Sequence, residues 1–344
     1  MAIRWEEGYA PVKGSLGTPG LLQVLADKIT NNATETSWVL DYPTNFSDVK
    51  DLFTVKHAVG TKFVYIEFSQ PEKVDDNDNY YFLEVRFGTN YTPPIAVEGS
   101  ATPPGVWNAD SGSVRSRFSW FKANGGSFVR GWLPVQFWLS IQATSIGMIL
   151  AGDASAGYDD RLVSFGYFGA IKPFKDDVGT NPDTNFGVTV SSDSSPLEYL
   201  SNDELTCYGD NTGNGVIDIT MLETFTGFPM QAHYAAFTTP DEFINKRLDG
   251  PSVYTKKYHM SPVYIFHGYG GYRGELYGVV ATDKSALVNL DEMIYKYNSV
   301  NPELPTPDTQ DTYKVFLVNA PYSIMNSSDN VLYGVALLKE TKTI

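Results

Sequence analysis

Short stretches rich in aromatic and β-branched residues follow one another along most of the chain, with few helical patterns between them. Residues 62–68 and 80–87 are two such stretches, and the polar segment that joins them predicts a hairpin. Strands that come in runs favour antiparallel sheets over a doubly wound parallel sheet. The sequence therefore predicts a mainly β fold (β-rich α+β) with a few short helices, built as antiparallel β-sandwich or barrel-like domains. Further strands are expected over residues 38–41, 52–57, 117–122, 128–140, 145–151, 162–171, 186–191, 216–220, 262–267, 276–281, 313–319 and 331–339.

Three segments show the apolar spacing of a helix. In the first, residues 21–29, Thr18 is at the expected N-cap and Pro19 at the expected first helical position. The second, residues 241–248, is short and is also preceded by Thr and Pro. The third lies near residues 284–297, where apolar residues recur three and four positions apart. These three are the few helices that we expect.

The length of 344 residues predicts more than one domain. A long segment rich in Asp, Asn, Ser, Thr and Gly covers residues 175–215, and it is typical of a linker or an arm. We therefore expect an aromatic-rich β domain over residues 1–174, the polar linker over 175–215, and a second β-rich domain over 216–344 that carries the helix near 284–297.

The charge balance argues against several partners. The chain has 25 Lys and Arg against 40 Asp and Glu, for a net charge of −15. Binding to nucleic acid or to an anionic membrane surface depends on basic residues, so neither is expected. No apolar run is long enough to span a bilayer, and the N-terminus lacks the apolar core of a signal peptide. The single cysteine, Cys207, excludes a disulfide within the chain and suits a reducing cytoplasm.

A weak candidate for a metal site is the loop that begins at Asp210. Asp210, Asn214 and Asp218 stand at positions 1, 5 and 9 of a calcium-loop pattern. Met221 stands at position 12, where such a loop needs a bidentate carboxylate, so a turn that leads into a strand from Val216 is favoured. We therefore predict no metal and no other cofactor.

No catalytic motif stands out. The chain has no G-x-S-x-G elbow and no H-E-x-x-H helix pattern. The glycine-rich residues 268–278 break the phosphate-loop register at Arg273, and a strand follows them, which favours a tight turn or a backbone packed against a neighbouring chain. We predict a protein that is not an enzyme and has no catalytic residues. A β-rich hydrolase stays open as an alternative, because the sequence does not locate a carboxylate pair.

Several segments resemble a known class of proteins. They consist of Gly, aromatic and aliphatic residues and cover 147–153, 161–174, 272–280, 313–318 and 333–339. Together they are similar to virion structural proteins of large tailed bacteriophages, of the kind found in tails and baseplates. The resemblance implies a structural subunit whose partners are copies of itself and other virion proteins. It also implies a location in the virion after assembly in the cytoplasm of the host bacterium, and a head–tail connector component is an alternative position.

The aromatic content supports a role in assembly. Aromatic residues make up 14% of the chain, with 22 Tyr and 20 Phe, and such side chains are enriched at protein–protein contacts. We therefore expect a homo-oligomer in which loops such as residues 98–116 become ordered on assembly. An alternative function is binding of a host receptor or a host surface glycan, for which Trp107 and Trp120 are the candidate stacking residues.

Overall fold

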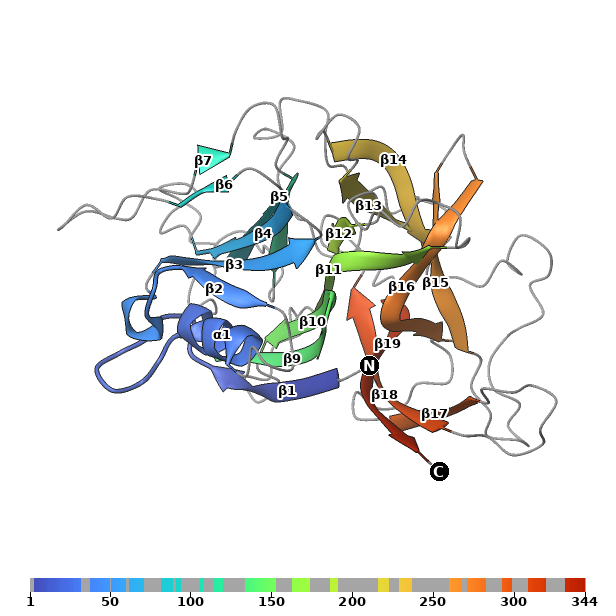
Figure 1. Ribbon diagram of the computed structural model, residues 1–344. Coiled ribbons are helices and arrows are strands. Elements are labelled where there is room, and N and C mark those ends of the chain that lie inside the picture. The colour runs from blue at the N-terminus through green and yellow to red at the C-terminus, as the bar shows by residue number, and fades with distance from the viewer. Residues whose placement is uncertain are drawn as a thin grey trace, which may run out of the picture.

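The structure is a computed structural model, shown in Figure 1. It describes residues 3–31, 38–49, 51–59, 62–70, 82–88, 91–93, 106–107, 114–119, 134–152, 163–173, 186–190, 216–222, 229–236, 260–267, 271–282, 293–298, 309–319 and 332–343. Strands dominate these residues and pair antiparallel, which confirms the prediction of a mainly β fold. No helix among them is long and apolar enough to cross a membrane.

Two short helices accompany the strands in the described ranges, α1 (Leu21–Thr30) and the 3-10 helix η1 (Phe46–Asp48). The strands are β1 (Ile3–Ala10), β2 (Val39–Tyr42), β3 (Leu52–Val59), β4 (Lys62–Ser69), β5 (Phe82–Gly88), β6 (Tyr91–Thr92), β7 (Val106–Trp107), β8 (Val114–Ser119), β9 (Val135–Gln142), β10 (Ser145–Gly152), β11 (Val163–Pro173), β12 (Phe186–Val190), β13 (Val216–Leu222), β14 (Pro229–Ala236), β15 (Met260–His267), β16 (Gly271–Thr282), β17 (Met293–Asn298), β18 (Thr309–Asn319) and β19 (Leu332–Thr343).

Most strands belong to one large sheet of 12 strands, in the order β1-β9-β10-β11-β12-β13-β14-β15-β16-β19-β18-β17. An additional pairing joins β11 to β16, so that β11 through β16 form a closed ring of antiparallel neighbours. A small sheet of 5 strands has the order β2-β3-β4-β5-β8. Its β4–β5 pair, with Phe68 opposite Val85, confirms the hairpin predicted between residues 62–68 and 80–87.

The strands β9 and β10 are buried on both sides, which explains their nearly continuous apolar sequence. Leu139 and Met148 point into a first core that lies against α1 and the small sheet. Trp138 and Ile149 point the other way, into a second core against strands that include β16, β18 and β19. The molecule is thus layered, with β9 and β10 between two packed regions.

The described part of the glycine-rich segment, residues 271–278 of β16, packs against β11 and β9. A Cβ atom on Gly274 would lie 2.2 Å from the backbone oxygen of Lys172, so only glycine lets β16 approach β11 this closely. Gly278 has a φ of 65°, and a Cβ there would lie 2.0 Å from Nε2 of Gln142. The glycines therefore permit close packing of this backbone against strands of the same chain.

The helix predicted over residues 21–29 is confirmed as α1, but the expected N-cap at Thr18 and first helical position at Pro19 are wrong. The N-cap is Gly20, which makes no side-chain cap, and Thr18 instead forms a β-bridge with Ser15. The reason is local, because Ser15 and Thr18 exchange two backbone hydrogen bonds of 2.9 Å that hold Thr18 in a turn. The amide of Leu21 donates to the carbonyl of Pro11 at 2.8 Å, outside the helix.

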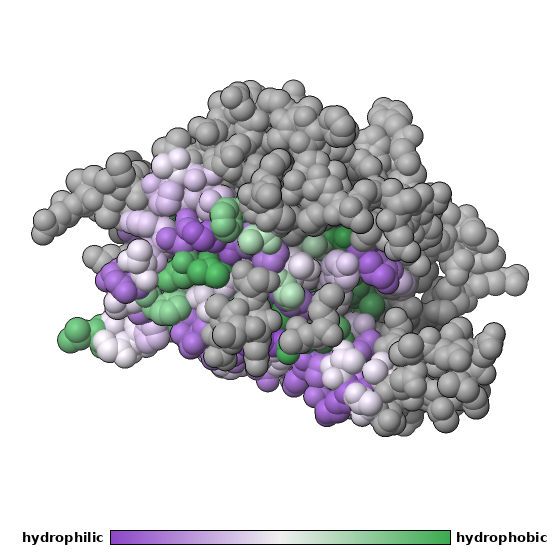
Figure 2. Space-filling model, viewed as in Figure 1, coloured by the Kyte–Doolittle hydropathy of each residue, from purple (hydrophilic) through white to green (hydrophobic). Residues whose placement is uncertain are grey.

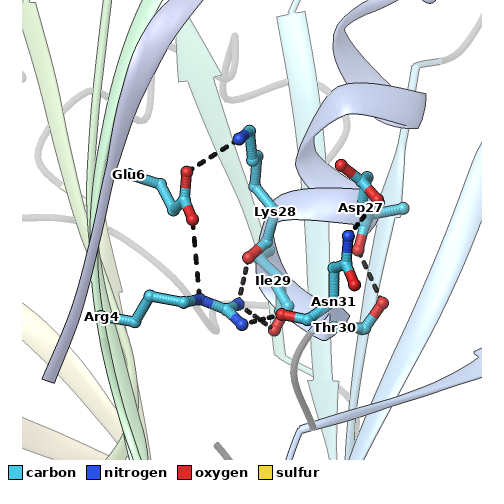
Figure 3. A network of polar contacts seen from close by, with 8 residues as sticks. Arg4, Glu6, Asp27, Lys28, Ile29, Thr30 and Asn31 are labelled. Atoms are coloured by element: carbon cyan, nitrogen blue, oxygen red, sulfur yellow. Dashed lines mark hydrogen bonds and ion pairs between the residues drawn. The ribbon is translucent and has the colours of Figure 1, made fainter. Parts of the chain in front are cut away.

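The C-terminal end of α1 is fixed to β1 by Arg4 (Figure 3). Its guanidinium donates to the backbone oxygens of Lys28, Asn31 and Ile29, the last at 2.8 Å. These carbonyls have no partner within the helix, so Arg4 supplies hydrogen bonds and a favourable charge at the negative end of the helix dipole. Glu6 completes the network, with an oxygen 2.8 Å from Nζ of Lys28.

The helix predicted near residues 284–297 is wrong over its last residues. Residues 293–297 belong to the strand β17, which pairs with β18 along its whole length. The apolar spacing was compatible with a helix, but alternating aromatic residues beside a long strand favour extended pairing. Residues 284–292 and the helix predicted over 241–248 lie outside the described residues.

Other predictions on organisation have mixed outcomes. The strand β12 lies inside the predicted linker 175–215, and the large sheet runs from β1 to β19 across the predicted domain boundary. The division into domains over 1–174 and 216–344 stays a prediction. The sequence missed β1 and β14, whose residues show little β-prone alternation, and the two-residue strands β6 and β7, of which β7 lies inside the predicted loop 98–116.

Candidate functional site

The two faces of the small sheet differ sharply in chemistry. Along β4, Val64, Ile66 and Phe68 point into the first core, while Phe63, Tyr65 and Glu67 alternate with them and point away from it. We call the second side the outer face. Tyr91 of β6 packs onto this face. The buried end of the outer face consists of Thr54, Glu67, Glu84 and Arg86 together with Tyr91. The exposed end consists of Val39, Asp41, Lys56, Phe63 and Tyr65.

Glu67 is the centre of the buried end of the outer face. Its side chain is fully buried, and the Tyr91 hydroxyl donates a hydrogen bond of 2.8 Å to its Oε2. The Thr54 hydroxyl lies 2.7 Å from the Tyr91 oxygen and so acts as the donor there. Nε of Arg86 lies 3.9 Å from Oε1 of Glu67 and 3.2 Å from Oε1 of Glu84. One arginine thus compensates two nearly buried carboxylates.

The same network controls the ionisation of Tyr91. Burial is the main cause that raises the pKa of the Tyr91 hydroxyl, and the nearby carboxylate of Glu67 raises it further. Tyr91 therefore stays protonated and keeps donating to Glu67. A catalytic acid or base must reach its substrate, whereas Glu67 has no exposed surface and already binds a hydroxyl and a guanidinium. The arrangement is that of a structural anchor that holds β6 on the sheet.

The exposed end of the outer face also has a carboxylate, a cationic side chain and an aromatic ring, but here the ring is open to solvent. The Phe63 side chain is 43% exposed, and Val39 on β2 is 45% exposed. Nζ of Lys56 lies 2.6 Å from Oδ1 of Asp41 and 5.3 Å from the centroid of the Phe63 ring. The hydrogen bond to Asp41 raises the pKa of the Lys56 ammonium, so the ammonium stays charged. A row of aromatic rings leads from the exposed end to the buried end. The ring centroids of Phe63 and Tyr65 are 6.2 Å apart, and those of Tyr65 and Tyr91 are 5.4 Å apart.

A second exposed feature is the loop between β1 and α1, residues 13–19, which we call the Leu16 loop. Every residue in it is exposed, and the side chain of Leu16 at its tip is fully exposed. The loop is closed at its base, where a Cβ on Gly20 would lie 2.6 Å from the backbone nitrogen of Gly14. The Ser15–Thr18 bonds fix the tip. The loop therefore presents one apolar side chain on a defined backbone.

The described surface has no large apolar area in the view of Figure 2. Green side chains form small groups among purple and white ones. The largest exposed apolar side chains among the described residues are those of Tyr9, Leu16, Val39 and Phe63. Candidate contact points are therefore single side chains and their immediate polar neighbours.

The predicted metal loop is not brought together by the described residues. Asp210 and Asn214 lie outside them, and Asp218 lies on β13 with its backbone opposite Tyr234. The described residues contain no group of three or more His, Cys, Asp or Glu side chains that could hold a metal ion. The pairing of β14 with β15 also places the backbones of His233 and His267 opposite each other, which spacing along the chain did not indicate.

Of the two tryptophans predicted as stacking residues, the structure describes the backbone of one. Trp107 on β7 pairs with Tyr91 on β6, so this segment lies beside the outer face. Trp120 lies outside the described residues. Phe63, Glu67 and Leu16 were not predicted from the sequence. A carboxylate inside an otherwise apolar strand, and a leucine enclosed by Gly, Ser and Thr, were the available signals.

Comparisons with known proteins add no relative. No protein-family model, no curated protein and no solved structure matches the chain.

Proposed function

We propose that this chain is a non-enzymatic structural subunit that works through protein–protein contacts. The observation that carries the proposal is the fully exposed Leu16 on a loop of fixed backbone. Burial of a leucine side chain contributes about 1.5–3 kcal/mol, and a preorganised loop loses little conformational freedom on binding. Tyr9 is 61% exposed near the end of β1, an edge strand of the large sheet, and is a second exposed side chain that could contact a partner.

The partners in this proposal are copies of the chain and other proteins of a bacteriophage tail or baseplate, with a head–tail connector as an alternative position. The support is the resemblance of the five segments given above, which overlap β10, β11, β16, β18 and β19. Two of these segments touch, because a Cβ on Gly147 would lie 3.1 Å from Cδ2 of Leu337. The resemblance is one of packing residues, so it carries no catalytic group. The chain is then assembled in the host cytoplasm and resides in the virion.

The assembly proposal is tested by analytical ultracentrifugation of the full chain and two variants. We expect the wild type to sediment as a homo-oligomer. Leu16→Asp should raise the dissociation constant about 30-fold or more, because central apolar anchors contribute about 2 kcal/mol or more. Val39→Asp changes a half-exposed side chain on a different face and is the matched control, with no expected effect. The proposal would be contradicted if wild type and both variants sediment as monomers, or if Leu16→Asp associates as strongly as wild type.

The virion part has its own test, in the genes that flank the coding region. Neighbours that encode tail or baseplate proteins support it. Neighbours that encode a metabolic pathway contradict it and leave the ultracentrifugation result intact.

A further inference from the structure

The exposed end of the outer face has the composition of a small ligand site. It places an exposed aromatic ring, a partly exposed ammonium and a carboxylate within a few ångströms of one another. We infer that this end, formed by Asp41, Lys56, Phe63 and Tyr65, binds a ring of a neutral saccharide. The inference is independent of the proposed assembly function and concerns a different surface.

Phe63 is the stacking surface. Its ring is 43% exposed and stands beside the half-buried ring of Tyr65, with 6.2 Å between centroids. The face of an aromatic ring carries negative potential, which attracts the weakly positive C–H groups on one side of a sugar ring. Tyr65 in turn contacts the ring of Tyr91, and the Tyr91 hydroxyl is hydrogen-bonded to the buried Glu67. These contacts hold the Tyr65 ring in place beside Phe63.

Asp41 and Lys56 supply the hydrogen bonds. The ammonium has three N–H donors and is 33% exposed, so its contact of 2.6 Å with the Asp41 carboxylate, which is 12% exposed, leaves donors for hydroxyl groups. The ammonium lies over the Phe63 ring, 5.3 Å from its centroid, and covers part of the ring. A sugar that covers the open part of the ring therefore has its hydroxyl edge next to this pair.

Charge and size both favour a neutral sugar over other occupants. The two charges of the pair cancel, and the chain as a whole carries −15, so neither attracts a phosphate or a sulfate. A stable protein interface buries about 800 Å² on each partner. The large apolar side chains exposed at this end are only Val39 and Phe63 among the described residues, which suits one or two sugar rings better than a protein.

The experiment is a glycan array of neutral and anionic oligosaccharides, followed by calorimetry with the strongest neutral ligand. We expect wild type to retain neutral oligosaccharides. Phe63→Ala should lower the affinity about tenfold or more, as expected for loss of a stacking ring. Phe63→Tyr keeps an aromatic ring and should bind about as tightly as wild type. Asp41→Asn should lower the affinity by less than Phe63→Ala does. Lys342→Ala changes an exposed side chain of β19 that belongs to neither proposed surface and is the control, with affinity unchanged.

Three results would overturn the inference. They are an array with no retained glycan, retention of anionic glycans alone, and equal affinity of wild type and Phe63→Ala. A change in sedimentation of Phe63→Ala without a change in glycan retention would identify a protein contact instead. Thermal unfolding of each variant shows that the compared proteins are folded.

Discussion

The buried and exposed ends of the outer face are made from the same residue classes and differ in what covers them. Each has a carboxylate, a cationic side chain and an aromatic ring. At the buried end Tyr91 covers Glu67 and donates to its Oε2, while the Thr54 hydroxyl donates to Tyr91. At the exposed end Phe63 is open to solvent beside the Asp41–Lys56 pair. Residue type therefore does not decide which end of the outer face is covered, because the position of the β6 segment, which carries Tyr91, decides it.

The largest expected effect is at Glu67. Glu67→Ala removes the acceptor of Tyr91 and a partner of Arg86, both in a buried setting. Breaking a buried charged network in this way lowers the free energy of unfolding by about 3–5 kcal/mol. Urea denaturation measures the change, and Glu67→Gln should lose less because it keeps an acceptor oxygen. A loss below about 1 kcal/mol would mean that the buried end behaves like a surface ion pair.

Tyr91→Phe should have an intermediate effect. It removes one hydroxyl that connects Thr54 to Glu67 and leaves the ring contact with Tyr65 in place. A lost hydrogen bond to a buried charged group lowers the free energy of unfolding by about 1–3 kcal/mol. The same urea titration at neutral pH checks this value, and equal stability of the two proteins would contradict it.

The pH dependence of this variant has a definite sign. In the folded protein the pKa of Tyr91 is raised above its ordinary value of 10.0, so the unfolded chain releases this proton first as pH rises. The stabilisation is complete below pH 10 and is lost above it. Tyr91→Phe should therefore lose less stability than wild type between neutral pH and strongly alkaline pH. Tyr167 and Tyr313, whose pKa values burial also raises, remain in both proteins.

The smallest effect is expected at the exposed end. Asp41→Asn removes the charge that faces Lys56 but leaves an amide of similar shape. Partly exposed ion pairs contribute about 0–1 kcal/mol, and salt screens them. We expect a decrease below about 1 kcal/mol in the free energy of unfolding, with the gap to wild type narrowing at high salt. A loss as large as that of Glu67→Ala would remove the distinction between the two ends.

The strands of the small sheet illustrate what sequence reasoning predicts well. The hairpin of β4 and β5 follows from two β-prone stretches and a polar connection, because neighbouring strands along the chain pair locally. The helix α1 follows from its apolar stripe. The strand β17 did not follow, because the spacing of its apolar residues suits a helix as well, and only pairing with β18 selects the extended form.

The candidate site was harder to predict, for a similar reason. Phe63 and Phe68 lie on one strand and are both aromatic, yet Phe63 is exposed and Phe68 is fully buried, 4.8 Å from the ring of Phe53. Alternation predicts that they face opposite ways, but not which way is inward. Trp107 was a reasonable candidate for stacking, and its segment does lie beside the outer face, through the pairing with Tyr91.

By itself, the sequence determined the mainly β character, the antiparallel pairing of neighbouring strands and the helix at α1, because these depend on periodicity and local propensity. Only the tertiary structure decided that β11 meets β16, that Arg4 closes the end of α1, and that Glu67 is covered while Phe63 is not. These outcomes depend on contacts between residues far apart in the chain. Their free energies come from burial and packing of a particular arrangement, which local residue patterns do not specify.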